Sequence, residues 1–379
     1  MMSRPITATI HHQALKHNLA IARKMMPNSQ VFAVVKANAY GHGIERIFEA
    51  FQSADGFALL DIAEAKRLRQ LGWKGKILLL EGIFSPRDLY DCAELKFDFT
   101  VHSPHQLQWL QSFSETQTDH SDDSVQFDVY LKLNSGMNRL GFKPEAYRQA
   151  WQELQRLSVV NSITHMTHFS DADGERLGEQ GVLYQQKIFD QITADLPGLR
   201  SISNSAAILR YATELESDVV RSGIMLYGSS PDYPKHTIQH WQLEPTMSLR
   251  SEIIAIQDLK SQDSVGYGST YFAENSLRIG IVACGYADGY QRLSETGTPI
   301  LVDGIRTQTI GRVSMDMLAV DLSDIPNAQV GSEVVLWGRS TSGAVLAIDD
   351  VAQSSGTVGY ELMCAVTNRV NFQIEIANE

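Results

Sequence analysis

The sequence predicts a TIM-type α/β barrel, a (β/α)8 fold, followed by a mainly antiparallel β domain. Short apolar runs rich in β-branched residues recur through the first two-thirds of the chain, with helical patterns between most of them. Eight strands with intervening helices over about 200 residues match the arithmetic of such a barrel. The pattern changes near Leu243-Glu244-Pro245. We therefore expect a barrel over residues 11–243 and a β domain over residues 244–379.

The eight runs predicted as barrel strands each read as a short, buried segment. They are Val31–Val35, Gly56–Leu60, Lys76–Leu80, Phe97–Val101, Phe127–Leu133, Ile163–Thr167, Leu199–Ser203 and Val219–Tyr227. Helix starts lie between them. Asp61, with Glu64 three residues on, is typical of a capping box. Pro86, Pro104 and Pro144 stand where proline opens a helix.

Beyond the change of pattern, short strands are separated by turns rich in Gly, Asp, Asn and Ser, which favours an antiparallel sheet. The predicted strands are Ser248–Ile256, Leu277–Cys284, Pro299–Val302, Thr307–Ile310, Met317–Asp321, Glu333–Trp337 and Asn371–Ile376. Helical patterns cover Asp349–Ser354 and Tyr360–Val366. The early strand Ile6–Ile10, within residues 1–10, is expected to pair with this domain.

Composition narrows the class of protein. A formal net charge of -12 without a basic stretch argues against nucleic acid and anionic membranes as partners. Three distant cysteines, Cys92, Cys284 and Cys364, give neither a disulfide framework nor a metal-ligand spacing, so no metal is expected. The N-terminus has no apolar secretory signal, and no membrane span is visible. We expect a cytoplasmic protein.

In a barrel of this type the active site lies at the carboxyl ends of the strands, with phosphate often held after strands seven and eight. Lys36 closes the first apolar run. It is either a lysine that snorkels to the rim or a desolvated amine able to form a Schiff base. Ser205 follows run seven, and Gly223 and Ile224 lie in run eight. Their hydroxyl and amides would form a phosphate cradle.

Three further polar residues fall on the same predicted rim. His168 follows run six, Arg139 follows run five, and Arg221 lies in run eight. Taken alone, His168 reads as a satisfied core histidine and Arg139 as a surface cation at a helix start. Neither reading explains why both share a rim with Lys36.

The segment Ala33-Val-Val-Lys36-Ala-Asn-Ala-Tyr40-Gly-His-Gly closely resembles the pyridoxal phosphate (PLP) attachment motif of alanine racemases. The resemblance spans nearly the whole chain in the family's order. It continues in Leu133-Asn-Ser-Gly-Met-Asn-Arg139, Met166-Thr-His168-Phe, Asn204-Ser205-Ala, Arg221-Ser-Gly223-Ile224, Gly266-Tyr267-Gly, Gly285-Tyr286-Ala-Asp288-Gly, Gly311-Arg-Val-Ser-Met315-Asp316 and Gly359-Tyr360-Glu361.

The resemblance implies a role for each matching residue. Lys36 would hold PLP covalently, Arg221 would face its pyridine nitrogen, and Arg139 would contact its phenolic oxygen and the substrate carboxylate. The phosphate contacts would come from Tyr40, Ser205, Gly223, Ile224 and Tyr360. His168 would link Arg221 to Tyr267. A lysine matching Lys132 is carbamylated in many relatives. The alternative here is a plain inward lysine.

The resemblance also implies a homodimer with shared active sites. Tyr267 would reach in from the second subunit as the catalytic partner of Lys36, and Met315 would bring its backbone amide to the substrate carboxylate. Tyr286 and Arg292 would line the substrate access path, with Asp316 in support.

Racemisation needs two bases on opposite faces of the substrate carbon, because a single base would mainly return the same proton. The expected activity is interconversion of L- and D-alanine, supplying D-alanine for peptidoglycan or serving alanine catabolism. Three alternatives stay open: a racemase of another small amino acid such as serine, a barrel-type PLP decarboxylase, and a non-enzymatic PLP carrier. The β domain speaks against the last.

Overall fold

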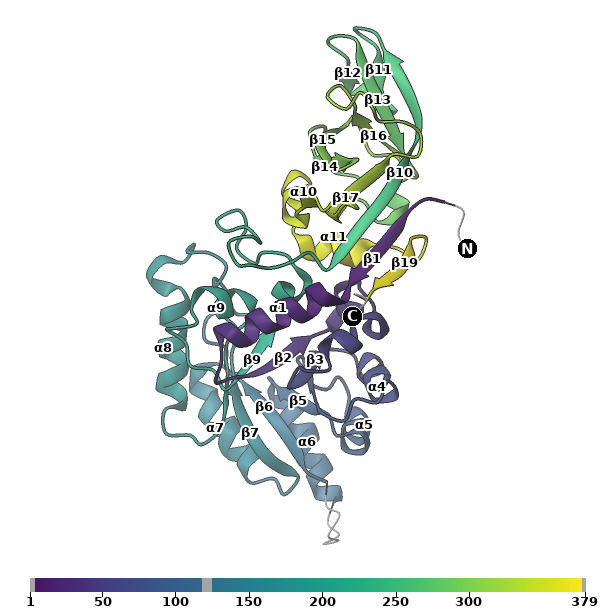
Figure 1. The fold of residues 1–379 in the computed structure, drawn as a ribbon. Helices are drawn as coiled ribbons and strands as arrows, with labels where there is room; N and C mark the ends of the chain where they lie inside the picture. Colours follow the sequence, from purple (N-terminus) through teal and green to yellow (C-terminus); the bar gives the residue numbers. More distant parts are fainter. Residues whose placement is uncertain (1–3, 118–124, 377–379) are drawn as a thin grey trace. The chain divides into compact units, whose positions relative to one another are not determined.

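The computed structural model describes residues 4–117 and 125–376, and the chain divides into two compact units (Figure 1). The barrel unit comprises Leu19–Ala39 and Phe48–Leu226. The β unit comprises the N-terminal segment through Asn18, the segment Tyr40–Ile47 and everything from Tyr227 onward. Residues 1–3 of the predicted segment 1–10 lie outside the described residues.

The barrel unit contains eight parallel strands in the order β8-β7-β6-β5-β4-β3-β2-β9, which confirms the predicted fold class. The backbone N–H of Arg221 donates to Ser203 O at 3.0 Å, which joins β9 to the chain after β8. The strands are β2 Gln30–Val34, β3 Gly56–Leu59, β4 Lys76–Leu79, β5 Asp98–Val101, β6 Phe127–Lys132, β7 Val160–Met166, β8 Arg200–Ser201 and β9 Val219–Ser222.

Two of these strands, β8 and β9, are shorter than the sequence predicts by more than one residue. Strand β8 ends early because the N–H of Ile202 donates to Ser217 Oγ, a side chain, instead of a neighbouring strand. Strand β9 ends at Ser222, and residues Ile224–Tyr227 form the 3-10 turn η3. Both strands are cut short next to the predicted phosphate cradle.

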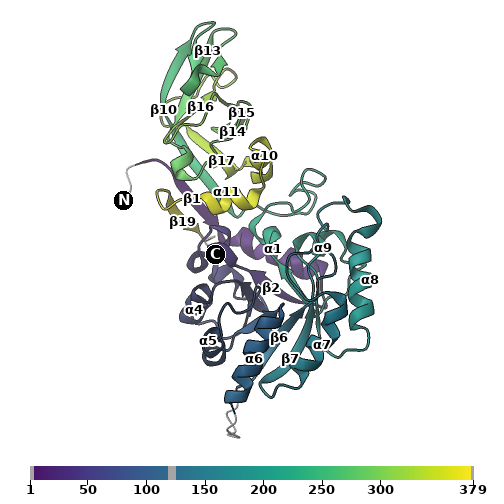
Figure 2. The same cartoon turned by 180° about the vertical axis from the view of Figure 1, so that it is seen from behind.

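The helices of the barrel unit lie around the strands (Figure 2). They are α1 His12–Met25, which is shared with the β unit, α2 Lys36–Tyr40, η1 Glu49–Phe51, α4 Ile62–Gln70, α5 Asp88–Leu95, α6 Pro104–Thr116, α7 Pro144–Gln155, η2 Gly178–Gln180, α8 Val182–Thr193 and α9 Ser205–Arg210. Amphipathic patterning explains their positions, since α4 buries Ala65 and Leu68 and leaves charged side chains outside.

The predicted helix starts are confirmed in part. Proline opens α6 and α7, and Asp61 caps α4 by accepting from the N–H of Ala63 at 2.7 Å. The prediction for Pro86 was wrong. Helix α5 begins at Asp88, because its carboxylate binds the N–H groups of Phe84 and Ser85 and forms a turn before the helix.

The β unit is built on a nine-stranded sheet in the order β18-β17-β14-β15-β16-β13-β10-β1-β19, antiparallel except between β1 and β19. Because β17 also pairs with β10, the strands from β17 to β10 close on themselves. The strands are β1 Thr7–His11, β10 Met247–Leu259, β13 Leu277–Val282, β14 Pro299–Val302, β15 Ile305–Ile310, β16 Leu318–Asp321, β17 Glu333–Arg339, β18 Val345–Leu346 and β19 Asn371–Glu375.

The early strand β1 lies between β10 and β19, so the N-terminal segment belongs to this sheet. A separate hairpin pairs β11 Ser264–Val265 with β12 Tyr271–Phe272. The short helices are α3 Ile44–Ile47, η4 Tyr267–Ser269, η5 Tyr286–Asp288, α10 Ile348–Ser354 and α11 Gly359–Ala365. Within residues 4–117 and 125–376, no helix combines the length and apolar character needed to cross a bilayer.

Candidate active site

Lys36 opens a left-handed turn at the carboxyl end of β2. The residues Ala37, Asn38, Ala39 and Tyr40 have φ values of 53°, 51°, 56° and 50°. Left-handed backbone costs about 1–2 kcal/mol per residue when a Cβ is present. A run of such residues persists only where the surroundings hold it, and strained backbone of this kind gathers at functional sites.

Helix α4 supplies part of that support. Glu64 accepts a hydrogen bond from the N–H of Asn38 at 2.6 Å, and Arg67 donates to Asn38 Oδ1 at 2.9 Å. The sequence predicted Glu64 as the second half of a capping box. In the structure its carboxylate instead supports the turn after Lys36.

Lys132, at the end of β6, belongs to a cluster of basic groups at the same rim. Its side chain is almost fully buried. Burial, followed by the charges of Arg221 and Arg139, lowers the pKa of Lys132 to about 7, while Glu81 acts in the opposite direction. Lys36 also contributes to this lowering. The cluster is strongly positive and suits an anionic ligand.

Arg221, on β9, is a buried cation held by neutral groups. Burial lowers its pKa to about 10. Its Nη1 donates to Ser201 O at 2.7 Å and to Ser201 Oγ at 2.6 Å, and its Nη2 donates to Thr167 O at 2.8 Å. None of these acceptors is a carboxylate. A buried charge without a counter-ion is costly, so a bound anion would offset that cost.

His168 lies beside Arg221, with Nδ1 3.4 Å from Arg221 Nη2. Burial and the neighbouring cations, Arg221 first among them, hold the pKa of His168 well below its usual value, so the ring is neutral. Nε2 lies 3.4 Å from the amide nitrogen of Asn204, which like the guanidinium can only donate, so a neutral ring accepts from one of these two groups and not from both.

Ser205 and the backbone after β9 form a small ring of polar groups. The Ser205 hydroxyl accepts from the N–H of Gly223 at 2.9 Å and from the N–H of Met225 at 3.4 Å. Asn204, not Ser205, caps helix α9, since its side chain accepts from the N–H of Ala207. The Ser205 oxygen thus already gathers two backbone donors, as the oxygen of a bound phosphate would.

The β unit brings the two predicted phosphate tyrosines together. The ring centroids of Tyr40 and Tyr360 are 6.0 Å apart, and Tyr40 stacks on Tyr227 at 4.6 Å. Burial raises the pKa of Tyr40, so its phenol stays protonated and available as a donor. Gly41 permits this packing, because a Cβ there would lie 2.1 Å from Met363 O.

The remaining candidates lie at the surface of the β unit. Tyr267 is 76% exposed and stands between Gly266 and Gly268, which both have positive φ. Met315 is 52% exposed, and its carbonyl accepts from the N–H of Ala287 at 3.0 Å.

The other predicted residues of this surface are placed as follows. Asp316 accepts from Arg369 at 2.6 Å, and its carbonyl accepts from Arg4. Tyr286 begins η5, and its N–H binds Ser314 O. Arg292 lines a cavity of about 420 Å³ that Thr270 and Arg312 also border. These contacts link Tyr286 to the Met315 loop and place Arg292 beside the segment that follows Tyr267.

Comparison with known proteins identifies the family. The model of the alanine racemase N-terminal domain matches residues 10–231, and the model of the C-terminal domain matches residues 246–374. An alanine racemase of Acinetobacter baumannii strain SDF is 67% identical over 371 residues, covering 98% of this chain and 99% of that protein. The chain belongs to the alanine racemase family. Solved structures agree.

The crystal structure of a biosynthetic alanine racemase from Pseudomonas aeruginosa matches with a TM-score of 0.90 at 42% identity, covering 98% of this chain and all of that one. The crystal structure of an alanine racemase from E.faecalis matches with a TM-score of 0.85 at 31% identity, covering 98% of each chain. The chain is therefore an isomerase of the PLP-dependent alanine racemase family.

The residues at the barrel rim fit the PLP of an alanine racemase. The amides gathered by Ser205 suit a phosphate, and the cluster around Lys132 supplies positive charge. No group of His, Cys, Asp and Glu in the described residues has the arrangement of a metal site. The sequence missed Ser201 and Glu64 as supports, because their partners Arg221 and Asn38 are distant in the chain and no local motif marks them.

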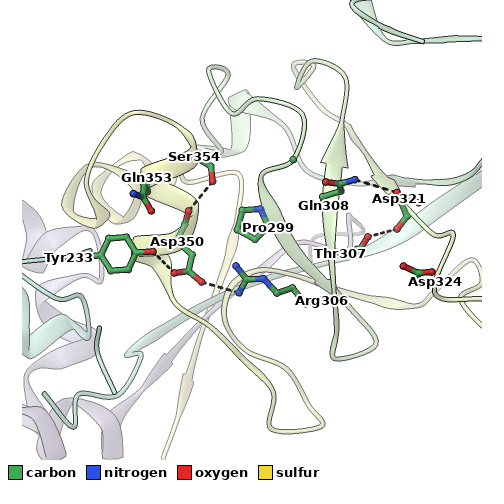
Figure 3. A pocket seen from close by; sticks show the side chains of 11 residues that line it. Tyr233, Pro299, Arg306, Thr307, Gln308, Asp321, Asp324, Asp350, Gln353 and Ser354 are labelled. Carbon is green, nitrogen blue, oxygen red and sulfur yellow. Dashed lines mark hydrogen bonds and ion pairs between the residues drawn. The ribbon is translucent and has the colours of Figure 1, made fainter. Parts of the chain in front are cut away.

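Two other features of the molecule hold none of the predicted racemase residues. A cavity of about 460 Å³ lies in the β unit, and Figure 3 shows the side chains that line it. Its Asp350 is already bound by Tyr233 and Arg306.

The second feature links Ser248, His11 and Glu375 in the order of a hydrolase triad. Ser248 is fully buried, so its hydroxyl cannot meet a substrate. The three residues instead tie β10, β1 and β19 together.

Proposed function

We propose that this alanine racemase interconverts L- and D-alanine through two bases, Lys36 on one face of the substrate carbon and Tyr267 of a second copy on the other. The observation that carries the proposal is the cationic cluster at the rim, where Lys36, Lys132, Arg139 and Arg221 surround the neutral His168. Bound PLP would supply an electron sink for the electron pair left on the substrate carbon when a base removes its proton.

Two sets of residues would recognise the two anionic groups. Uncharged residues would bind the cofactor phosphate, and a cationic residue would bind the substrate carboxylate. Ser205, Gly223 and Ile224 would bind the phosphate through a hydroxyl and backbone amides, and the Gly223 amide, which donates to Ser205 Oγ in the structure, would donate to the phosphate instead. Tyr40 and Tyr360 would add phenol groups. Arg139 is exposed, so its guanidinium is accessible to the carboxylate of a substrate that binds and dissociates in each catalytic cycle. Lys132 has a pKa of about 7, so a large fraction of its amine is uncharged at neutral pH and open to carbamylation. The carbamate would then pair with Arg139.

Arg221 would donate to the cofactor's ring nitrogen and not protonate it, because arginine retains its proton. Such a partner would make the cofactor a weaker electron sink, which would favour return of the proton to the substrate carbon over its delivery to the cofactor, the step that leads to transamination. With Nδ1 accepting from Arg221, Nε2 would carry the proton and act as a donor. That donor would stabilise the phenolate form of Tyr267, so the three residues act as one chain.

The proposed homodimer rests on the exposure of Tyr267 and Met315 in a single chain. In an isologous pair, each copy would lend these residues to its partner, giving two equivalent composite sites. The backbone amide of Met315 would bind the substrate carboxylate, while Tyr286 and Arg292 would border the access path and Asp316 would hold the loop.

A cytoplasmic location is also part of the proposal. It rests on Cys92, Cys284 and Cys364, which form no disulfide among the described residues, as is usual in a reducing compartment. The product D-alanine would serve peptidoglycan synthesis, or the enzyme would feed alanine catabolism.

The test is incubation of the PLP-loaded enzyme with pure L-alanine, followed by chiral analysis. Racemisation ends near equal amounts of both enantiomers. Release of carbon dioxide without D-alanine would indicate a decarboxylase, and faster turnover of serine would indicate the other racemase. Borohydride reduction followed by peptide mapping should label Lys36. Labelling of another lysine would overturn the assignment.

A further inference from the structure

Arg221 has five N–H donors, and the barrel unit accounts for four of them. Nη1 donates to the carbonyl and the hydroxyl of Ser201. Nη2 donates to Thr167 O and faces Nδ1 of His168. The four contacts use both terminal nitrogens fully, so Nε–H is the donor that remains for a ligand.

Ser201 occupies two of these four donors. It is fully buried on β8, and its hydroxyl donates to Val219 O at 2.9 Å. That bond uses the single hydroxyl proton, so the lone pairs of Ser201 Oγ face Arg221 and accept from Nη1 at 2.6 Å. The hydroxyl therefore fixes both the position and the direction of the hydrogen bond, and it ties the guanidinium to the backbone of β9 itself.

We propose that Ser201 is a positioning residue for racemisation, which sets the plane of the Arg221 guanidinium so that Nε–H meets the ring nitrogen of the cofactor. The inference rests on the proposed function, since it gives Arg221 that partner. A methyl group in place of the hydroxyl leaves Nη1 with one acceptor where it had two. The plane then rotates more freely, and the donor to the ring nitrogen is misaligned.

The test compares Ser201→Ala with Ser201→Thr, which keeps the hydroxyl on a side chain suited to a strand. The matched control is Ser222→Ala. Ser222 follows Arg221 in β9, so its side chain points to the opposite face, and it is buried with no hydrogen-bond partner for Oγ in the described part of the chain. The measurements are kcat, the dissociation constant of PLP and the visible absorbance of the bound cofactor.

We expect Ser201→Ala to lower kcat about tenfold and to shift the cofactor absorbance, with the PLP dissociation constant changed less than about twofold, because the phosphate cradle is intact. Ser201→Thr and Ser222→Ala should stay within about twofold of the parent enzyme in all three measurements. A general packing defect would instead weaken PLP binding as well.

A double-mutant cycle shows whether Ser201 acts through Arg221. In an Arg221→Lys background the guanidinium is gone, so adding Ser201→Ala should cost less than about twofold in kcat. An equal loss in both backgrounds, or an unchanged kcat and absorbance in Ser201→Ala alone, would overturn the inference. Should Ser201→Ala fail to fold, Ser201→Cys, a weak acceptor of similar size, provides the same comparison.

The outcome is separable from that of the proposed function. If the parent enzyme neither binds PLP nor forms D-alanine, the proposed function fails and this inference fails with it. If the parent enzyme racemises alanine while Ser201→Ala matches it in rate and absorbance, only the role of Ser201 is rejected.

Discussion

Glu64 lies 2.6 Å from the backbone nitrogen of Asn38, so a carboxylate on α4 holds the third residue of the turn that begins at Lys36. The turn carries positive φ at residues without glycine's freedom, and this contact offsets part of that strain. The orientation of Lys36 therefore depends on a helix that contains none of the predicted catalytic residues.

Replacement of Glu64 should loosen the Lys36 turn. Glu64→Ala removes the acceptor, and we expect the free energy of unfolding to fall by about 1 kcal/mol and PLP to bind more weakly. Glu64→Gln keeps an acceptor oxygen and should lose less in both measurements. Urea titration and PLP binding provide the readouts. Equal losses for the two variants would show that the contact does not support the turn.

Lys132 should make stability depend on pH. Its pKa is lowered to about 7, so between that pH and the usual lysine pKa the folded protein binds fewer protons than the unfolded chain. Stability of the parent relative to Lys132→Met should therefore rise as the pH increases through this window. Urea midpoints at pH 6.5 and 9, in buffer free of carbon dioxide, test the sign. A difference that does not change with pH would contradict it.

The same lowered pKa makes Lys132 a nucleophile near neutral pH. We expect bicarbonate to add one carbon dioxide to this amine, and acidification to remove it. Native mass spectrometry of the parent and of Lys132→Met detects the change. A parent that gains no mass would show that the lysine stays unmodified.

Subunit exchange tests the composite site. Lys36→Ala and Tyr267→Phe should each be nearly inactive, whereas mixed dimers contain one site with both native residues. Random exchange makes half of the dimers mixed, each with one of two sites intact, so about a quarter of the parent activity should return. Mixtures that stay inactive after verified exchange would place both residues within one chain.

Gly285 should control the position of Met315. Its φ of -153° suits any residue, but a Cβ there would lie 2.4 Å from the carbonyl oxygens of both Ser314 and Met315. We expect Gly285→Ala to displace this loop and to raise KM for alanine several-fold, with PLP affinity unchanged. Steady-state kinetics and PLP titration separate the two effects. A parent-like KM would exclude a role of this loop in substrate binding.

Much of the barrel was predictable from the sequence, because buried parallel strands consist of continuous apolar residues. The residues that follow each run lie at the carboxyl ends of the strands and therefore form the rim. The position of Lys36 after the first run came from that rule. The left-handed turn did not, since Ala37 and Ala39 carry no signal for positive φ. The early end of β9 was not predictable either. The N–H of Gly223, just after the strand, donates to Ser205, which is distant in the sequence.

Long-range contacts explain what the sequence could not show at the site. The lowered pKa of Lys132 depends on burial and on Arg221 and Arg139, which only the closed barrel brings near. The brace between Ser201 and Arg221 joins two strands. Such pairs have no spacing rule, whereas a cap such as Asp61 acts within its own turn and was predicted.

The uncompensated guanidinium inside the barrel has a consequence for the life of the polypeptide. An anion that binds only the folded chain shifts the folding equilibrium in proportion to the logarithm of its concentration. When a cell runs short of vitamin B6, newly made chains would lack the stabilisation that bound PLP provides. They would unfold more often and would be degraded by proteases sooner. Nutrient supply would then set the abundance of this enzyme as well as its turnover.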